Sequence, residues 1–343
     1  MKNPRFDKSS SHAGSPWRCL GFTRIRRLAA AAVAAIAMSG GGAQAAENGA
    51  GFYLLGNKGP GAGVLPPPGV FFQNDFYFYD GHFGGSKGLP LNGNVVAGVK
   101  AQLYGDFLTF LAVAPWDVAG GNLGFTIVIP VGGPNITALA SVIGPRGNEF
   151  SRSVSDSTFT IGDLVFGPML GWHAGKFHWN VAALINAPSG DYHPGQIANL
   201  AFHRWGADFT GSLTWLDPEL GLDLSMAIGI TVNGKNPVTN YKTGTEFHLE
   251  WAVSKNIGKQ FSVGLLGYHY QQLSNDSGSG ARLGGFKGRV TAVGATMAYN
   301  MLIASHPVSA RIKFFSEFNT QNRPEGQAVF LTLSTPITMF GAE

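Results

Sequence analysis

The sequence predicts an all-β protein: a single transmembrane antiparallel β-barrel of about 12 strands, preceded by a cleaved signal peptide. Three observations predict this fold. Apolar and polar residues alternate in short stretches, the gaps between these stretches are alternately long and short, and the first 45 residues resemble a secretory leader. In a membrane barrel the apolar side chains face lipid, whereas small and polar side chains face the lumen. In a soluble β-sandwich the apolar face would form a core instead.

Residues 1–45 have the order of a secretory signal. Three arginines at positions 24–27 precede the apolar run 28–38, and the small-x-small sequence Ala43-Gln44-Ala45 follows it. An apolar run of this length is too short to span a bilayer as a helix. We therefore expect the mature chain to consist of a Gly/Pro-rich segment, residues 46–68, and the barrel, residues 69–343. The segment could insert into the lumen as a plug or remain in the periplasm.

Removing the leader changes the charge of the chain. The full sequence has 24 basic and 20 acidic residues. Without the leader's seven basic residues and one acidic residue, the mature chain has 17 and 19, a net charge of about −2. The basic character therefore belongs to the leader, so we expect no nucleic-acid partner. Cys19, the only cysteine, lies in the leader as well, so we expect no disulfide.

Alternating stretches follow one another along the mature chain. The clearest covers 222–233, where Leu, Met, Ile and Val occupy every second position. Side chains alternate faces along a strand, so each such stretch predicts a strand with one apolar face. Most have the 9–11 residues that a tilted transmembrane strand needs. The expected strands are 69–79, 95–113, 121–131, 160–171, 176–188, 204–216, 220–233, 243–256, 259–271, 287–300, 307–318 and 327–338.

Loop length follows the parity of the strands. The gaps after odd-numbered strands are long: 80–94, 132–159, 189–203, 234–242, 272–286 and 319–326. Those after even-numbered strands are mostly tight. Short periplasmic turns and longer outer loops are typical of a transmembrane barrel, with both termini in the periplasm. The longest gap, 132–159, contains the apolar run 136–143, which could fold inward as a lid or plug.

Aromatic residues lie near the ends of the apolar faces. Since Trp and Tyr favour the interface between hydrocarbon and headgroups, these residues predict girdles; the alternative is the aromatic core of a soluble β-protein. The pairs are Phe177 and Trp179, Trp205 and Trp215, Phe247 and Trp251, and Phe314 and Phe318. Phe340 resembles the terminal aromatic that the outer-membrane assembly machinery prefers, so we expect that machinery and outer-membrane lipids as partners.

The same alternation predicts which side chains line the lumen. Charges of both signs in a narrow tube can pair and fill it, which is a structural role. Alternatively, some form a constriction or a ladder of polar contacts for a passing solute. The candidates are Asp75, Tyr77, Lys100, Tyr104, Asp106, Asp163, Arg204, Asp208, Asp223, Glu246, His248, Glu250, Arg311, Lys313 and Glu317.

Glu246, His248 and Glu250 share one face of a strand. They could form a metal or acid/base site, but a strand spaces alternate residues about 7 Å apart, too far for convergence without neighbouring strands. We expect a structural or pore-lining role, no metal and no cofactor. A lipid-modifying enzyme would need a Ser–His pair at the rim. Only His269, beside Gln271 and Ser274, suggests one loosely, so we expect no enzyme.

Several motifs resemble one family of Gram-negative outer-membrane proteins. They are the start of the barrel at 65–77, Gly162-Asp163 with Pro168, the turn at 188–192, and residues 241–246 and 271–280. As a set, they are similar to the family of the meta-pathway of phenol degradation, whose members are described as transporters encoded near aromatic-compound breakdown pathways. The resemblance implies a channel in the outer membrane of a Gram-negative bacterium. It would facilitate uptake of small hydrophobic, including aromatic, solutes. The alternative is a non-transporting structural or adhesion-type barrel.

Overall fold

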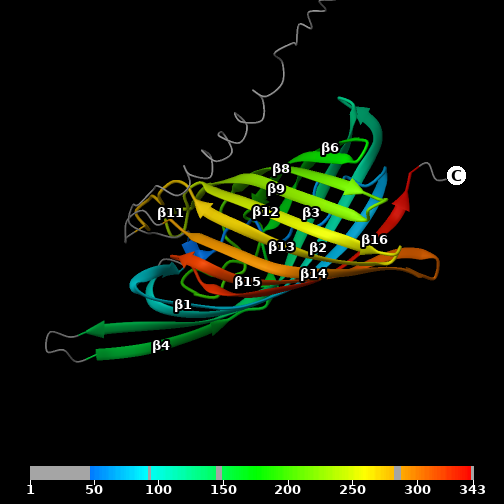
Figure 1. Ribbon diagram of the computed structural model, residues 1–343. Coiled ribbons are helices and arrows are strands. Elements are labelled where there is room, and N and C mark those ends of the chain that lie inside the picture. Colours follow the sequence, from blue (N-terminus) through cyan, green and yellow to red (C-terminus); the bar gives the residue numbers. More distant parts are fainter. Residues whose placement is uncertain (1–46, 92–93, 144–148, 282–286, 341–343) are drawn as a thin grey trace, which may run out of the picture. The chain divides into compact units, whose positions relative to one another are not determined.

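Twelve long antiparallel strands close into a barrel in the computed structural model, which describes residues 47–91, 94–143, 149–281 and 287–340 (Figure 1). Closure comes from β1 (Gly69–Leu91), which pairs with β16 (Glu325–Met339) and with β2 (Asn94–Val118). β2 in turn pairs with β3 (Gly121–Ile143). The other wall strands are β6 (Leu164–Ala174), β7 (Phe177–Ala187), β8 (Gly206–Asp217), β9 (Leu222–Asn233), β12 (Glu246–Ile257), β13 (Phe261–Gln272), β14 (Arg289–Ile303) and β15 (His306–Gln321). The predicted all-β antiparallel barrel of about 12 strands is confirmed, whereas the predicted signal peptide, residues 1–45, lies outside the described residues.

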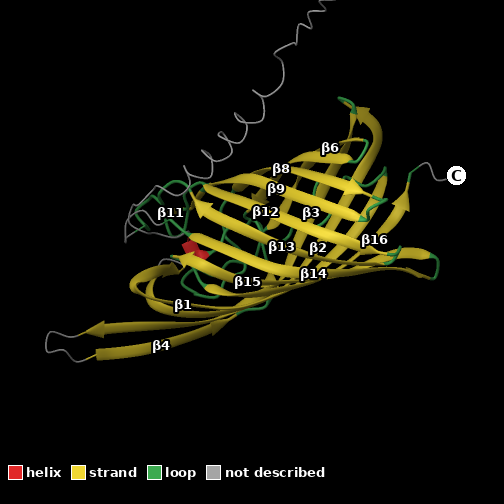
Figure 2. Ribbon diagram, in the orientation of Figure 1, coloured by secondary structure: helices red, strands yellow, loops and turns green. Residues whose placement is uncertain are grey.

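The short elements are the 3-10 turn η1 (Glu47–Gly49), β5 (Thr160–Ile161), which pairs with β3, and β10 (Lys235–Asn236), which pairs with β11 (Tyr241–Lys242). Figure 2 shows that strands dominate the described chain. Within the described ranges, no helix has the length and apolar character needed to cross a bilayer.

Two of the predicted outer loops are mostly strand. β1 and β2 continue as a hairpin to Leu91 and Asn94, where the sequence predicts a loop over 80–94. Likewise β3 continues to Ile143 and pairs with β4 (Glu149–Ser157). The run 136–143 is therefore not an inward-folded lid, because its backbone groups pair in a ladder. Ile136 and Ala138 pack against Val99 of the neighbouring hairpin. In Figure 1, the β3–β4 hairpin projects beyond the barrel.

Loop length follows the predicted parity for part of the wall, whereas the β15–β16 connection, residues 322–324, is as short as the tight turns. At one end the strands are joined by the tight turns 119–120, 175–176, 218–221, 258–260 and 304–305. Gly175 and Gly258 have φ angles of 58° and 70°, which glycine adopts without steric cost. Longer connections at the other end, 188–205, 234–245 and 273–288, form the outer loops. β1 begins and β16 ends at the tight-turn end, which is the periplasmic end of such a barrel.

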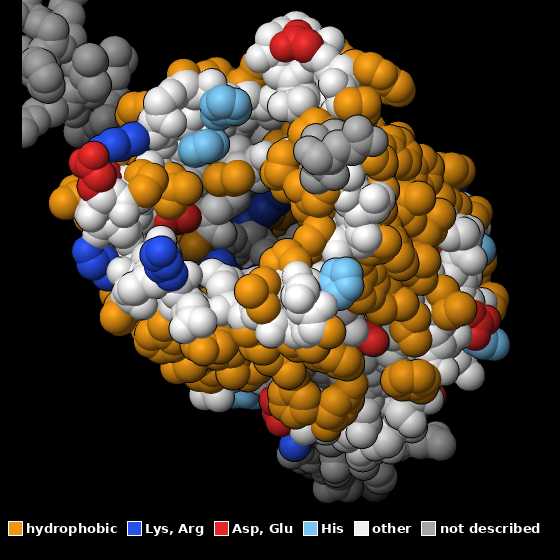
Figure 3. Space-filling model, turned by 90° about the vertical axis from the view of Figure 1, so that its right-hand side faces the viewer, with side chains coloured by type: hydrophobic (Ala, Val, Ile, Leu, Met, Phe, Trp, Pro, Cys, Tyr) orange, Lys and Arg blue, Asp and Glu red, His pale blue; other side chains and the backbone are white. Residues whose placement is uncertain are grey.

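The outer face of the wall is apolar and exposed, and the inner face is buried. On β9, Met226 is 44% exposed whereas Ala227 is 1% exposed. Figure 3, viewed from the tight-turn end, shows hydrophobic side chains over the outside and a hollow with charged side chains inside it. Such a belt is stable only against lipid, since it would expose far more apolar surface to water than a soluble protein does. The barrel therefore spans a lipid membrane.

The predicted girdle aromatics lie on this outer face. Phe177 and Trp179 are exposed at the tight-turn end, where Trp179 stacks on Trp172 with ring centroids 6.3 Å apart. Trp205 is 58% exposed at the outer end. Aromatic side chains at both rims fit the two membrane–water interfaces.

Candidate functional site

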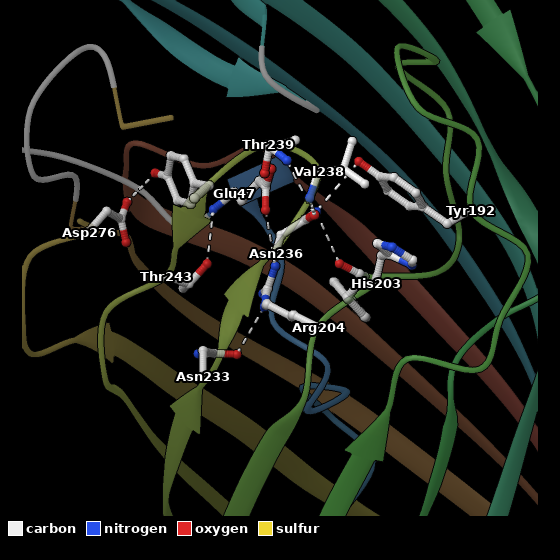
Figure 4. Close-up of polar contacts among 12 residues, drawn as sticks. Glu47, Tyr192, His203, Arg204, Asn233, Asn236, Val238, Thr239, Thr243 and Asp276 are labelled. Carbon is white, nitrogen blue, oxygen red and sulfur yellow. Dashed lines mark hydrogen bonds and ion pairs between the residues drawn. The ribbon is translucent and has the colours of Figure 1, made fainter. Parts of the chain in front are cut away.

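The lumen contains the chain's own Gly/Pro-rich segment, residues 47–68, which we call the inner segment. At the outer end, the Glu47 N–H donates to Thr243 Oγ1 at 3.4 Å (Figure 4). Near the tight-turn end, the Gly63 N–H donates to Thr214 Oγ1 at 2.8 Å, and Asn180 Nδ2 donates to the Ala62 carbonyl at 2.9 Å. The inner segment therefore runs from the outer loops down to the start of β1.

Glu250, on β12, holds the middle of the inner segment. Its carboxylate accepts the Tyr53 hydroxyl at 2.7 Å and the Lys58 N–H at 3.0 Å. The Tyr53 ring also stacks on His248, with centroids 3.6 Å apart. From β15, Lys313 Nζ donates to the carbonyls of Gly56 and Asn57 at 2.7 and 2.8 Å. Side chains of the wall thus satisfy polar groups of the segment that are shielded from water.

Glycine allows the inner segment to approach the wall closely. A Cβ at Gly63 would lie 2.5 Å from both the His178 carbonyl oxygen and the Thr214 nitrogen, which are backbone atoms of β7 and β8. A Cβ at Gly56, where φ is 83°, would lie 2.7 Å from the Phe315 ring. Neither position can take a side chain without movement of the segment. Gly56 and Gly63 are therefore required by packing inside the barrel.

A buried ion pair anchors the start of the inner segment. Arg204 Nη1 lies 3.5 Å from Glu47 Oε2, and both side chains are 1% exposed. Arg204 Nε donates to Asn233 Oδ1 at 3.2 Å, and Asn233 Nδ2 donates to Glu246 Oε2 at 2.8 Å. Figure 4 shows Glu47, Arg204 and Asn233 converging from the inner segment, an outer loop and the outer end of β9. Breaking such a pair on one side leaves an uncompensated buried charge, which is strongly destabilising.

Hydrogen bonds also hold the outer loops together. Asp276 accepts the Gly244 N–H at 2.8 Å and Gln272 Nε2 at 2.6 Å, and it accepts the Tyr241 hydroxyl as well. Burial raises the pKa of the Asp276 carboxyl to about 7, against the hydrogen bonds that lower it. Its protonation state therefore changes near neutral pH.

Most of the candidate lumen residues lie on the inner face. Asp208 is representative: its carboxylate accepts Thr210 Oγ1 at 2.5 Å and Thr231 Oγ1 at 2.6 Å, and it lies 2.8 Å from His248 Nε2. Tyr77 faces a cavity described below, and Arg311 shares the inward alternation of Lys313 on β15. The buried candidates are Asp75, Asp163, Arg204, Asp208, Asp223, Glu246, His248, Glu250, Lys313 and Glu317.

Three candidates are misplaced by the sequence prediction. Lys100, Tyr104 and Asp106 lie on the outer face of β2. Tyr104 packs edge-on against Phe78, which is 42% exposed, and Asp106 lies opposite Phe76, which is 46% exposed. The prediction assumed that polar side chains always face the lumen. On β2 the inward positions are apolar instead, so the assumption fails there.

These apolar positions line a cavity that the sequence did not predict. It measures about 250 Å³ and lies between the inner segment and the wall formed by β1–β3, β6 and β7. A ring of polar side chains at one edge comprises Tyr77, Tyr79, Tyr268, Glu317 and Arg323. The apolar lining comprises Leu54, Leu55, Leu103, Phe107, Val128, Pro130, Val165 and Leu184. On β2 the signal was present in the sequence as the apolar inward residues Ala101, Leu103 and Phe107, which alternate with the outward Lys100, Tyr104 and Asp106.

The strand residues Glu246, His248 and Glu250 each contact a different partner within the barrel. Glu246 accepts the Tyr270 hydroxyl at 2.6 Å, His248 faces Asp208, and Glu250 holds the inner segment. Among the described residues, no group of three or more His, Cys, Asp and Glu side chains could hold a metal ion. His269, the other residue singled out for chemistry, contacts Thr291 Oγ1 at 2.9 Å.

Comparisons with known proteins agree with this architecture. The chain is similar in structure to an outer-membrane channel from Pseudomonas putida F1, with a TM-score of 0.60 and 14% identity, over 80% of this chain and 98% of the other. A Pseudomonas aeruginosa FadL homologue matches with a TM-score of 0.41 and 10% identity, over 86% and 99% of the two chains. No curated protein sequence matches. The model of the family described as "Putative MetA-pathway of phenol degradation" matches residues 85–333, and the chain belongs to this family.

Proposed function

We propose that this protein is an outer-membrane channel that facilitates uptake of small hydrophobic compounds, aromatic ones among them. The observation that supports this function best is the cavity of about 250 Å³ in the lumen, with an apolar wall and a polar edge. Small-molecule sites are typically concave and mostly apolar, with a few polar groups that orient the ligand. Membership in a family named for phenol degradation favours aromatic solutes.

The two sides of the lumen have different roles in this proposal. The strands from β8 to β15 present charged and hydroxyl side chains, which pair with one another or with the inner segment. The strands from β1 to β7 present Leu103, Phe107 and Val165 to the open space. A hydrophobic solute would therefore move along the apolar side, while the polar side holds the inner segment in place.

The inner segment acts as a hatch in this proposal. It occupies the lumen along the barrel, so ions and large polar solutes do not pass freely while it is docked. Because it is held by hydrogen bonds and one ion pair rather than by strand pairing, it can shift without unfolding the barrel. A local change of this kind is a common way for a protein to gate access.

Uptake by intact cells tests the function. We expect a strain that lacks the protein to accumulate radiolabelled toluene more slowly than its parent, and complementation to restore the rate. Equal rates in a strain lacking the protein and in its parent would refute a transport role. That result would favour the alternative, a non-transporting structural or adhesion-type barrel, for which the projecting β3–β4 hairpin offers a contact surface.

A further inference from the structure

An arginine with unpaired donors lies at the edge of the lumen cavity. Arg323 belongs to the connection between β15 and β16 and lines the cavity with Tyr79 and Glu317. Its Nε and Nη1 atoms are buried and have no hydrogen-bond partner. Buried N–H groups nearly always have partners in native proteins, so each unpaired one requires an explanation.

The Arg323 side chain is held in place by its surroundings. Its guanidinium carbon lies 4.3 Å from the centroid of the Tyr270 ring, and the Tyr270 hydroxyl donates to Glu246 at 2.6 Å. The preceding residue, Asn322, has a φ of 54° and donates from Nδ2 to the Lys287 carbonyl at 3.0 Å. A guanidinium stacked on an aromatic face keeps its N–H edge free for an acceptor.

Glu317, the carboxylate that shares this edge of the cavity with Arg323, accepts hydrogen bonds from other groups. Glu317 accepts the hydroxyls of Tyr79 and Tyr268, each at 2.8 Å, and the Gly326 N–H at 2.9 Å. In the part of the chain that the structure describes, no carboxylate forms an ion pair with Arg323. The Nε and Nη1 donors of Arg323 therefore have no oxygen acceptor among the described residues. The rest of the cavity lining is largely apolar.

We propose that Arg323 binds an oxygen acceptor carried by a small aromatic molecule in this cavity. The aromatic ring would lie against Leu103 and Phe107, and the oxygen, of a phenol or of an aryl carboxylate, would accept from the guanidinium. This proposal rests on the proposed function, because it assigns the substrate class of the same cavity. It makes Arg323 a specificity-determining residue that distinguishes oxygen-bearing aromatics from plain hydrocarbons.

Calorimetric titration of the purified mature protein in detergent tests this assignment. The ligands are toluene, phenol and benzoate, which share a ring and differ in the oxygen and its charge. Because a hydrogen bond to a charged group is worth roughly 1.5 kcal/mol or more, we expect phenol or benzoate to bind about tenfold more tightly than toluene. The stronger of these two ligands identifies whether the oxygen is neutral or anionic.

Variants separate recognition from packing. Arg323→Met keeps the length of the side chain and should abolish the preference for oxygen while changing toluene binding less than about twofold. Arg323→Lys, which keeps the charge, should retain part of the preference and provides a second test if the first variant does not fold. The matched control is Arg289→Met, since Arg289 Nε is also buried and unpaired but does not line the cavity.

Each result has a distinct meaning. Equal loss of affinity for all three ligands in Arg323→Met would show a packing role and overturn the assignment. Tight binding of toluene by the wild-type protein without any preference for oxygen would overturn it as well, but would leave the proposed function intact. Failure to bind any of the three ligands would count against both proposals.

Discussion

Replacing Glu250 by alanine should release the inner segment from the barrel wall. The side chain accepts two hydrogen bonds from the segment, from the Tyr53 hydroxyl and the Lys58 N–H. A hydrogen bond to a charged group contributes roughly 1.5–3 kcal/mol, so the lower value gives about 3 kcal/mol for the two. Since 1.4 kcal/mol corresponds to a factor of ten, the undocked population should rise by about two orders of magnitude.

Single-channel recording in planar bilayers measures this change as the frequency of conducting events. We expect rare openings in the wild type, frequent openings in Glu250→Ala, and a persistently open channel in a variant that lacks residues 46–66. Glu219→Ala is the control, because Glu219 lies in a tight turn with its side chain 87% exposed. If the deletion conducts but Glu250→Ala behaves like the wild type, Glu250 does not hold the segment. If the deletion does not conduct, the segment is not the barrier.

Three further predictions follow from packing, from lipid contact and from titration. Gly63→Ala places a methyl group 2.5 Å from backbone atoms of β7 and β8 and should increase opening, whereas Gly211→Ala, with no atom within 4 Å, should not; equal effects in recordings would contradict the close approach. Met226→Arg, in the middle of the lipid-facing side of β9, should lower the free energy of unfolding in vesicles by about 2–4 kcal/mol, against about 0–1 for Ile257→Arg near the interface. Similar values for the two in urea titrations would argue against a lipid belt. Because burial raises the pKa of Asp276 to about 7 from its usual 3.8, its contribution to stability is greatest below about pH 4 and is lost as the pH rises through 7. The Gly244 amide, which donates to Asp276, should therefore be less protected from hydrogen exchange at pH 8 than at pH 5 after correction for intrinsic rates. Asp276→Asn should remove the difference, and pH-independent protection in the wild type would contradict the shift.

Most strands of the wall could be predicted because the two faces of a strand in a membrane barrel have different surroundings, lipid on one side and the lumen on the other. The alternation in 222–233 is strict, and the structure places β9 at Leu222–Asn233. The hairpin extensions beyond residues 80 and 132 were missed because they leave the membrane. There, the contrast between a lipid face and a lumen face is lost, although backbone pairing continues.

The lumen was harder to predict because polarity is not a reliable sign of direction. Asp208 and Glu250 face inward as expected, but Lys100, Tyr104 and Asp106 face outward. Every second residue of a strand faces the lumen, whatever its polarity. On β2 these inward positions are held by Ala101, Leu103 and Phe107. Arg323 was not singled out, because its position depends on contacts with Tyr270 and Asn322 in a short connection.

Blocking the cavity tests the central claim most directly. Ala101 and Ala112 both lie on β2, but Ala101 lines the cavity whereas Ala112 lies on the exposed outer face. In cells that lack the native protein, we expect Ala101→Trp to reduce uptake of radiolabelled toluene to the rate of the deletion strain, and Ala112→Trp to support uptake at the wild-type rate. Equal uptake through both variants, at matched levels in the outer membrane, would contradict a transport path through this cavity.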